Sequence, residues 1–377
     1  MTADRMPKSL EYAALFPGDH IPWPTVRASN NPEFKISALG GLYTVLCFFI
    51  TASDPAASAA LAAVAARQSL FDDAKLTFFG VSLDPVDESS GRCRQSLPGM
   101  RYFWDFDGGM ARAFGVLPVD PAGKTARRVW LVLDPALRVV AAFPLLPDNG
   151  NIGDIFAYLE RLPPVGLAAG VEVMAPVLYL PRVFEPDFCR ELIAMYEADG
   201  GQRSGFMREI DGRTEVVNDS SHKVRRDYVV EDADVIRAIQ ARVRRRIVPE
   251  VRKIHCFDPT HMERYLVGCY TAEEGGHFQP HRDNTTKGTA HRRFAVSINL
   301  NADFEGGELC FPEYGPRRFK PPPGGAVVFS CSLMHMVTPV TSGRRYAFLP
   351  FLYDEAASRL RLENNPFLAD ESLRYRG

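Results

Sequence analysis

The 377-residue sequence lacks several features that would place it in a specialised class of protein. Its 44 basic and 46 acidic side chains almost cancel, so it has no positive excess of the kind that general nucleic-acid binders carry. No uninterrupted apolar run approaches the ~20 residues that a membrane-spanning helix needs. The longest such run, residues 42–50, has the length of a strand. We therefore expect neither a nucleic-acid partner nor a membrane partner.

The sequence also lacks paired cysteines. Its seven cysteines are an odd number, and no two of them form a Cys-x-x-Cys motif. This pattern argues against a disulfide framework, a zinc ribbon and a thioredoxin-type redox pair. No long apolar segment follows the N-terminal charges, so no secretory signal is visible. We expect a cytoplasmic protein with reduced thiols.

What is present is typical of a globular chain with more than one domain. Apolar residues make up 46% and charged residues 24% of the sequence. At ~100–200 residues per domain, this length predicts two domains. A stretch rich in Pro, Gly and Ala follows Arg161 and ends the helical patterns. The predicted organisation is a domain over 1–165, a linker over 166–174, a second domain over 175–355 and a helical tail over 356–377.

The first half alternates between two kinds of element. Strands are predicted over 42–50, 76–83, 129–133 and 138–143, and helices over 56–72, 109–114 and 152–162. Strands that alternate with helices favour parallel pairing, whereas the last two strands are joined by a turn and favour an antiparallel hairpin. The pattern predicts an α/β domain.

Several motifs of this half occur in a familiar order. They are Phe16–Asp19, Leu46–Ile50, Asp105–Asp107, Ala113–Val116 and Arg128–Asp134. With these motifs, residues 11–162 resemble the thioredoxin-like fold in its peroxiredoxin branch. That family carries its peroxide-attacking cysteine in a Pro-x-x-x-Thr-x-x-Cys motif. Here Thr51 matches the threonine, but Cys47 stands at the proline position and Asp54 at the cysteine position.

This departure removes the chemistry that the family implies. A carboxylate cannot pass through the sulfenic acid stage that peroxide reduction requires. Cys47 lies within an apolar strand, where a thiol is usually inert, and Cys93 is the one thiol of this half that we expect to be exposed. We predict a non-catalytic domain that serves packing, partner binding or formation of a homodimer.

The second half begins with helices and continues with short strands. A helix is predicted to end near residue 198, and a long amphipathic helix over 232–255 should be kinked or split by Pro249. Its arginine-rich face is interpreted as a solvated surface. Short strands are predicted over 262–270, 294–300, 308–311, 326–329, 336–340 and 346–352. Their spacing favours a sandwich or jelly roll, so the whole chain is predicted to be an α+β two-domain protein.

Six of the eight histidines lie between residues 255 and 335. If His281 and Asp283 lie in one strand, positions i and i+2 share a face and both side chains can reach one metal ion. His335 lies on a different predicted strand. Two imidazoles and one carboxylate leave three coordination positions open, which suits a non-haem Fe(II) oxygenase.

An arginine pair follows the distal histidine by nine and ten residues. Because side chains alternate along a strand, only Arg344 or Arg345 can point into the same barrel. A guanidinium there would bind the distal carboxylate of a co-substrate in a bidentate manner.

Five stretches carry a second resemblance. They are Arg264–Tyr270, Phe278–Asp283, Val296–Asn301, Gly306–Leu309 and His335–Tyr346. Through them, residues 176–355 resemble the Fe(II)/2-oxoglutarate dioxygenase superfamily in its prolyl 4-hydroxylase-like branch. The resemblance implies a double-stranded β-helix flanked by helices, with Fe(II) held by His281, Asp283 and His335.

The same resemblance implies a co-substrate pocket and a reaction. Arg345, which precedes an aromatic residue, would bind the C5 carboxylate of 2-oxoglutarate, and Tyr270 would line the pocket. Asn299 falls where some members carry a second pocket tyrosine. O₂ and 2-oxoglutarate would be consumed, succinate and CO₂ released and a substrate hydroxylated, with ascorbate as the reductant. A prolyl residue of a protein or peptide is the leading substrate class, and small molecules stay open.

Two further expectations concern the substrate and an alternative function. The polar stretch 204–222 is long for a loop and is predicted to cover the active site. The alternative to a hydroxylase is a thiol-dependent redox or scaffold protein whose barrel domain is inert.

Overall fold

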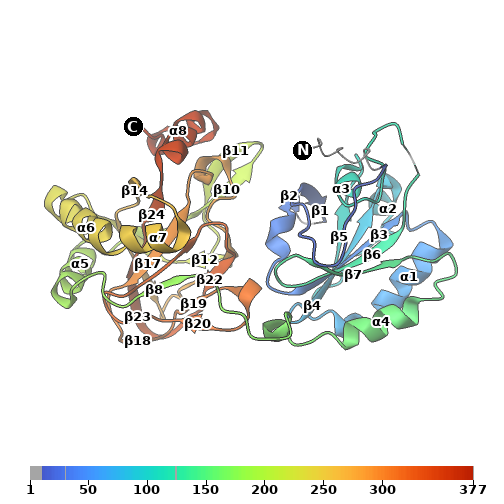
Figure 1. The fold of residues 1–377 in the computed structure, drawn as a ribbon, viewed down its shortest axis with the longest axis horizontal. Helices are drawn as coiled ribbons and strands as arrows, with labels where there is room; N and C mark the ends of the chain where they lie inside the picture. The colour runs from blue at the N-terminus through green and yellow to red at the C-terminus, as the bar shows by residue number, and fades with distance from the viewer. Residues whose placement is uncertain (1–10, 30, 124, 377) are drawn as a thin grey trace, which may run out of the picture. The chain divides into compact units, whose positions relative to one another are not determined.

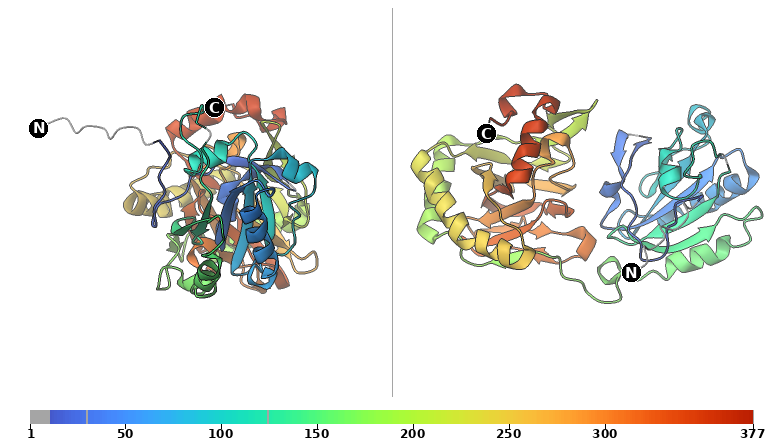
Figure 2. Two further views of the ribbon diagram at one scale, coloured as in Figure 1. Left: turned by 90° about the vertical axis from the view of Figure 1, so that its right-hand side faces the viewer. Right: turned by 45° about the horizontal axis from the view of Figure 1, so that its top comes forward.

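The computed structural model describes residues 11–29, 31–123 and 125–376. The chain forms two compact units. One unit ends at Val173 and also includes residues 313–315, and the other comprises residues 174–312 and the segment from Pro316 onward. In Figures 1 and 2 the first unit runs from blue to green and the second from green to red.

The N-terminal unit contains a mixed sheet with the strand order β2-β1-β5-β4-β3-β6-β7. The strands are β1 (Thr25–Ala28), β2 (Asn31–Lys35), β3 (Tyr43–Ile50), β4 (Leu76–Ser82), β5 (Met100–Trp104), β6 (Val129–Leu133) and β7 (Val139–Pro144). The helices are α1 (Pro55–Ala65), α2 (Pro85–Ser89), α3 (Gly109–Ala113) and α4 (Ile152–Glu160). Strands β3, β4 and β5 are parallel, and β6 and β7 form the predicted antiparallel hairpin.

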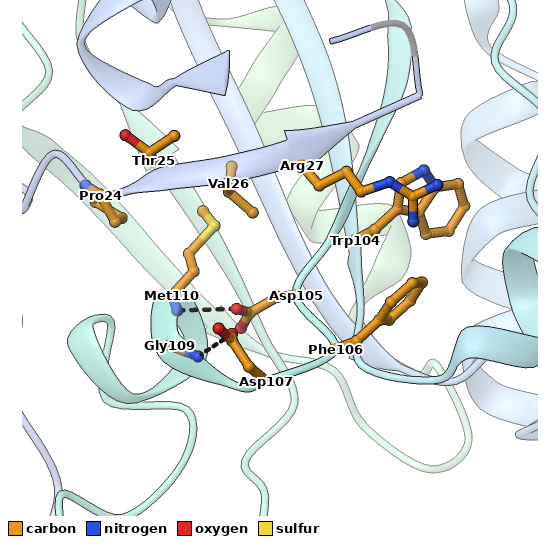
Figure 3. Close-up of a pocket in the computed structure, with 10 residues that line it drawn as sticks. All are labelled: Pro24, Thr25, Val26, Arg27, Trp104, Asp105, Phe106, Asp107, Gly109 and Met110. Carbon is orange, nitrogen blue, oxygen red and sulfur yellow. Dashed lines mark hydrogen bonds between the residues drawn. The ribbon is translucent and has the colours of Figure 1, made fainter. Parts of the chain in front are cut away.

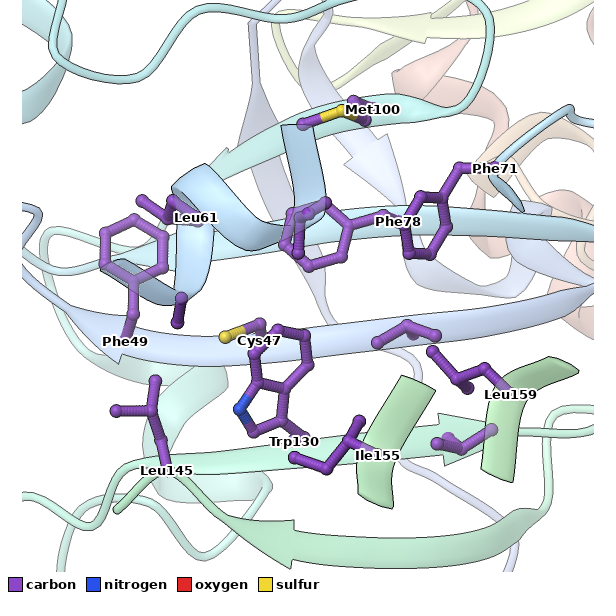
Figure 4. Close-up of a cluster of buried hydrophobic side chains, with 14 of the residues drawn as sticks. Cys47, Phe49, Leu61, Phe71, Phe78, Met100, Trp130, Leu145, Ile155 and Leu159 are labelled. Carbon is purple, nitrogen blue, oxygen red and sulfur yellow. The ribbon is translucent and has the colours of Figure 1, made fainter. Parts of the chain in front are cut away.

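Both faces of this sheet are covered, which explains the continuous apolar run of β3. Alternate residues of β3, such as Val45 and Cys47, pack with helices α1 and α4 on one face. The alternate residues Leu46 and Phe48 point to the other face and pack with α3. Figure 4 shows Cys47 beside Trp130 in the first of these clusters. The predicted helix over 56–72 is shorter than expected, since α1 ends at Ala65 and a separate 3-10 helix covers Gln68–Leu70.

Asp54, which stands at the cysteine position of the peroxiredoxin motif, caps the N-terminus of helix α1. Asp54 Oδ1 accepts hydrogen bonds from the backbone N–H groups of Ala56 and Ala57 at 3.0 Å and caps α1. Arg128 Nη1 also donates to this oxygen. Cys47 is fully buried, as predicted. The prediction of an exposed Cys93 is wrong, because packing against Tyr102 and its neighbours leaves that residue only 7% exposed.

The C-terminal unit contains two large antiparallel sheets and a separate sheet of two strands. The larger has the path β14-β24-β17-β23-β15-β13-β9. In addition, β21 pairs with β17, β8 pairs with β21, and β18 pairs with β23. Its strands are β8 (Leu178–Leu180), β9 (Gln202–Arg203), β13 (Arg226–Val229), β14 (His261–Glu263), β15 (Leu266–Thr271), β17 (Phe294–Asn299), β18 (Phe304–Gly306), β21 (Ala326–Ser330), β23 (Val340–Phe348) and β24 (Phe351–Tyr353). The smaller has the order β12-β16-β22-β19-β20. Its strands are β12 (Lys223–Val224), β16 (His277–His281), β19 (Leu309–Cys310), β20 (Arg318–Phe319) and β22 (His335–Val337). This is the jelly roll that the sequence predicts, and it confirms the α+β two-domain class.

Helices cover one face of the larger sheet (Figure 1). They are α5 (Pro186–Asp199), α6 (Ala233–Arg246) and α7 (Val248–His255), and α8 (Glu355–Glu363) follows the last strand. The predicted helix over 232–255 is split at Ile247, with Pro249 in the first turn of α7, where a missing N–H costs nothing. The apolar side chains of α5, α6 and α7 pack on Val267, Val296 and Phe348 of the larger sheet.

This packing fixes which residues of the larger sheet face the interior of the jelly roll. Along β15, β17 and β23, the residues that pack against the helices alternate with residues that point the other way. The second set comprises Gly268, Tyr270, Ser297, Asn299, Arg345 and Ala347.

The segment predicted as a long polar loop, 204–222, is largely ordered as a hairpin. Strand β10 (Phe206–Ile210) pairs with β11 (Arg213–Val217) in a sheet of two strands. The turn residues Asp211 and Gly212 both have positive φ, which explains the tight connection. Across the residues that the structure describes, none of the helices combines the length and apolarity that a membrane crossing requires.

Candidate metal centre

Two histidines and an aspartate converge at one end of the smaller sheet. His281 ends β16 and is paired directly with His335, which begins β22. Asp283 lies in the turn after β16, so the expectation that it shares a strand with His281 is wrong. Its backbone N–H donates to Cys331 O at 2.9 Å, and this bond turns the carboxylate back toward the two imidazoles. One ligand atom from each of the three residues lies within 4.8 Å of the others.

Backbone carbonyls fix the orientation of both imidazoles. His281 Nδ1 lies 2.7 Å from Gln279 O, and His335 Nδ1 lies 3.1 Å from Leu333 O. A carbonyl oxygen only accepts, so each Nδ1 carries the hydrogen and each Nε2 keeps its lone pair. The two Nε2 atoms lie 3.5 and 3.3 Å from the oxygens of Asp283. This is the tautomer that metal-binding histidines need.

The protonation states also suit a divalent cation. Burial lowers the pKa of His335 to about 4, so its ring is neutral at pH 7. Burial by itself raises the pKa of Asp283, but His335 and His281 outweigh this effect and hold that pKa below its usual value. A neutral imidazole and an ionised carboxylate are the forms that coordinate a metal ion.

Arg345 is the inward-facing member of the arginine pair. Its side chain is buried opposite Tyr270, and Nε donates to Asn299 Oδ1 at 3.1 Å while Nη2 donates to Ser297 Oγ at 2.8 Å. Among the described residues, the third nitrogen, Nη1, has no hydrogen-bond partner although it is buried. A buried cationic nitrogen without an acceptor is costly, so this atom marks a place for an anionic ligand.

Two further candidates from the sequence, Arg344 and Asn299, take different positions. Arg344 lies on the outer face of β23, with half of its side chain exposed, beside Glu197 and Glu273. Asn299 uses both ends of its amide, because Oδ1 accepts from Arg345 and Nδ2 donates to Pro321 O at 2.9 Å. Asn299 therefore holds Arg345 in place.

Aromatic rings connect the β10–β11 hairpin with the metal ligands. The ring of Phe278 stacks on His281 with centroids 3.5 Å apart. Phe206, at the base of the hairpin, lies 4.4 Å from the ring of His222 and 6.4 Å from that of Phe278. The base of the hairpin thus forms one wall beside the candidate metal centre.

The outer strand of the hairpin is held by two distant segments. Thr214 Oγ1 accepts from Gly288 N at 2.9 Å, and Thr214 O accepts from Ala369 N at 3.1 Å. Gly288 follows the metal-ligand turn, and a side chain there would collide with Leu368. These contacts tie the hairpin both to the segment that follows the turn with Asp283 and to the C-terminal segment.

A group of charged residues at the base of the hairpin was not predicted from the sequence. Lys223, Arg225 and Asp227 are largely buried and meet at Ser204. Burial lowers the pKa of Lys223 well below its usual value. The sequence does carry a signal for this group. Lys223, Arg225 and Asp227 occupy every second position, and in a strand such residues lie on the same face. The polar stretch predicted as a loop, 204–222, ends directly before these residues, and no element was predicted for residues 223–227.

A separate pocket lies in the N-terminal unit, with a volume of about 450 Å³ (Figure 3). Its walls are Pro24, Thr25, Val26, Arg27, Trp104, Asp105, Phe106, Asp107, Gly109 and Met110. Asp105 accepts from the backbone N–H groups of Met110 and Ala111 at 2.9 and 2.6 Å. Burial nevertheless raises the pKa of Asp105 to about 6.

Comparison with known families agrees with both halves of this description. Residues 237–353 match the model of the 2OG-Fe(II) oxygenase superfamily, and this stretch includes the three candidate ligands. Residues 17–142 match the model of the AhpC/TSA family. The match to the 2OG-Fe(II) oxygenase superfamily thus falls in the C-terminal unit, and the match to the AhpC/TSA family falls in the N-terminal unit.

Individual relatives are similar to parts of the chain. A PKHD-type hydroxylase of Pseudomonas fluorescens is 42% identical over 91 residues, which are 22% of this chain and 39% of the relative. The chain therefore matches about two fifths of that protein's length. A Trichoplax adhaerens prolyl hydroxylase, solved with a peptide fragment of hypoxia inducible factor, covers 49% of this chain and 86% of its own, with a TM-score of 0.40 and 16% identity. Xanthomonas campestris peroxiredoxin Q covers 37% of this chain and 95% of its own, with a TM-score of 0.31 and 21% identity.

Proposed function

We propose that the C-terminal unit is an Fe(II)- and 2-oxoglutarate-dependent dioxygenase that hydroxylates its substrate and releases succinate and CO₂. The observation that carries the proposal is the combination of the three converging ligands with the unpaired Nη1 of Arg345. The two histidines lie on the smaller sheet, Asp283 lies in the turn after β16, and Arg345 faces the same interior from the larger sheet.

The residues present fit Fe(II). Two imidazole nitrogens and one carboxylate oxygen form the facial donor set of non-haem iron oxygenases and leave positions for small ligands. His281, Asp283 and His335 would hold the metal. When bound, Fe(II) would supply the activation of O₂ that hydroxylation requires.

The chain's own residues would bind and orient the co-substrate. Arg345 Nη1 would donate to the C5 carboxylate of 2-oxoglutarate, in a buried place where a charge-assisted hydrogen bond is strong. Asn299 and Ser297 hold the guanidinium so that this nitrogen stays directed into the pocket. Tyr270, directly opposite Arg345, would place a hydroxyl donor beside the same ligand.

The substrate would enter between the metal centre and the β10–β11 hairpin. A prolyl residue of a protein or peptide is the leading class, because its compact aliphatic ring can pack against the aromatic wall formed by Phe206 and Phe278, and a small molecule is the second class. Ascorbate would keep the iron reduced. Seven free cysteines support a reducing cytoplasm as the protein's compartment.

The N-terminal unit would be non-catalytic and could mediate a homodimer. Burial raises the pKa of Cys47 and raises that of Cys93 to about 12, so neither thiol is set up to act as a thiolate. Asp54 and Arg128 occupy the place of the nucleophile. These observations disfavour the alternative of a thiol-dependent redox protein.

The proposal is tested by turnover with cell lysate as the source of substrate. Purified protein with Fe(II), ascorbate and 2-oxoglutarate should form succinate, and mass spectrometry should find a product heavier by one oxygen atom. That product should require 2-oxoglutarate and disappear with the His335→Ala variant. Equal product formation by the parent and by His335→Ala would reject the proposal.

A further inference from the structure

The side chains at the base of the hairpin form one hydrogen-bonded group centred on Arg225. Its Nε and Nη2 donate to the two carboxylate oxygens of Asp227 at 2.5 and 2.7 Å. Nη2 also donates to Ser204 Oγ at 3.2 Å, and Ser204 lies two residues before β10 begins. Lys223 donates to the same Ser204 Oγ at 2.6 Å and to Gly205 O at 2.6 Å. Both ends of the hairpin are therefore joined through this group.

The third nitrogen of Arg225 points in a different direction. Nη1 donates to the hydroxyl of Tyr270 at 3.3 Å. Tyr270 is the direct cross-strand neighbour of Arg345, and its ring lies 5.6 Å from the guanidinium carbon of Arg225 and 5.4 Å from that of Arg345. Gly268 makes the approach feasible, because a Cβ there would lie 3.0 Å from Arg225 Cδ. One guanidinium thus touches both the hairpin base and the candidate co-substrate pocket.

The contact decides what the tyrosine hydroxyl can do. A guanidinium has no acceptor, so in this hydrogen bond the phenol oxygen must accept. The hydroxyl hydrogen is then free to donate elsewhere, and Arg345, with its unpaired Nη1, faces the interior directly opposite. Arg225 therefore presents Tyr270 as a donor toward a ligand bound beside Arg345.

We propose that Arg225 is a positioning residue that couples co-substrate binding to the order of the β10–β11 hairpin. The inference rests on the proposed function, because the ligand that Tyr270 would contact is 2-oxoglutarate. When Tyr270 donates to the bound co-substrate, its oxygen becomes a better acceptor for Arg225, since donating and accepting hydrogen bonds strengthen each other. A firmly held Arg225 then fixes Ser204 and with it the start of β10. The order of events would be co-substrate first and a closed hairpin second.

The matched control is Arg264. This arginine also lies beside Asp227, with Nη2 3.5 Å from Oδ2, and belongs to the same charged group. Among the residues that the structure describes, Arg264 forms no hydrogen bond with Tyr270 or with Ser204, the two partners through which Arg225 would act. An Arg264→Gln variant therefore disturbs the charge balance around Asp227 without breaking the proposed connection.

The experiment uses the full chain loaded with Mn²⁺, a redox-inactive substitute for Fe²⁺, and has two readouts. Calorimetry gives the dissociation constant of 2-oxoglutarate. Hydrogen exchange gives the protection of residues 202–218 with and without 2-oxoglutarate. The variants are Arg225→Gln, Tyr270→Phe, the double variant and Arg264→Gln.

The parent and Arg264→Gln should bind 2-oxoglutarate similarly and gain protection in residues 202–218. Arg225→Gln and Tyr270→Phe should each weaken binding about tenfold, the effect of one buried hydrogen bond, and lose that gain in protection. The double variant should bind no more weakly than Tyr270→Phe, because Arg225 acts through the tyrosine hydroxyl.

Three results separate the ideas. If the parent does not bind 2-oxoglutarate, the proposed function fails. If the parent binds but Arg225→Gln weakens binding equally with or without the Tyr270 hydroxyl, the positioning role is overturned. If Arg225→Gln does not fold, Tyr270→Phe decides alone, and a full gain of hairpin protection in that variant overturns the coupling.

Discussion

Arg344 and Arg345 are adjacent in sequence but have opposite surroundings. Arg345 is buried and held by Asn299 and Ser297, whereas Arg344 is half exposed beside two glutamates. An exposed ion pair contributes little, while a buried guanidinium is the strongest available partner for a carboxylate.

This contrast gives a paired prediction for co-substrate affinity. Arg345→Gln should raise the dissociation constant of 2-oxoglutarate about 30-fold, because the loss of a buried charge-assisted hydrogen bond costs ~2 kcal/mol. Arg344→Gln should change it less than about twofold. Calorimetry on the metal-loaded variants measures both values. A larger effect at Arg344 than at Arg345 would show that the wrong arginine is placed in the pocket.

Asp105 in the N-terminal pocket predicts a pH dependence of stability. Burial raises its pKa to about 6, so the folded state holds this proton more tightly than the unfolded state, where the pKa is ~4. The stabilising contribution is complete below pH ~4 and is lost as the pH rises through 6.

Asp105→Asn should remove this dependence. Between pH 4 and 7, the free energy of unfolding of the parent should fall relative to that of the variant by about 2 kcal/mol, and denaturant unfolding at several pH values measures the difference. A difference that stays constant over this range would mean that Asp105 titrates normally.

At the scale of elements, we expect removal of the β10–β11 hairpin to abolish hydroxylation of the substrate while 2-oxoglutarate still binds. Replacing residues 207–216 by a short Gly-rich turn leaves Ser204, Lys223 and the metal ligands in place. Such a variant should still bind 2-oxoglutarate and form succinate slowly, but it should lose hydroxylation of the substrate. Undiminished hydroxylation in this variant would exclude a role for the hairpin in holding the substrate.

The elements with strong apolar patterns could be predicted from the sequence, and those defined by long-range pairing could not. The run over β3 and the amphipathic pattern of α6 and α7 show their buried faces directly. The β10–β11 hairpin has an irregular polar pattern, because its strands pair only with each other. Strand β5 was missed for a similar reason, since its pairing with β4 and β1 is not visible locally.

The candidate site shows the same division. His281, Asp283 and His335 could be proposed from residue type and order, and alternation along a strand left Arg344 and Arg345 as alternatives. The choice between them depends on which face of β23 the helices cover, and this is a tertiary property. Arg225 was missed because its importance comes from contacts with Ser204 and Tyr270, which are distant in sequence.

At the scale of the whole molecule, the N-terminal unit matches the AhpC/TSA family model but carries Asp54 at the position of the cysteine in the peroxiredoxin motif. Asp54 sits at a helix N-terminus next to Arg128, an environment that would lower the pKa of a thiol. The variant Asp54→Cys should therefore contain a thiol that reacts with Ellman's reagent faster than Cys256, the exposed cysteine of the chain. A rate no faster than that of Cys256 would show that this environment does not activate a thiol.

The central claim is that the C-terminal unit binds Fe(II) and 2-oxoglutarate together through the residues assigned to them. Anaerobic addition of both to the full chain tests it most directly, by a weak visible charge-transfer band. The account predicts that the parent and Arg344→Gln give the band, that His281→Ala abolishes it and that Arg345→Gln requires much more 2-oxoglutarate to produce it. A parent protein without the band, or a His281→Ala variant that retains it, would contradict the account.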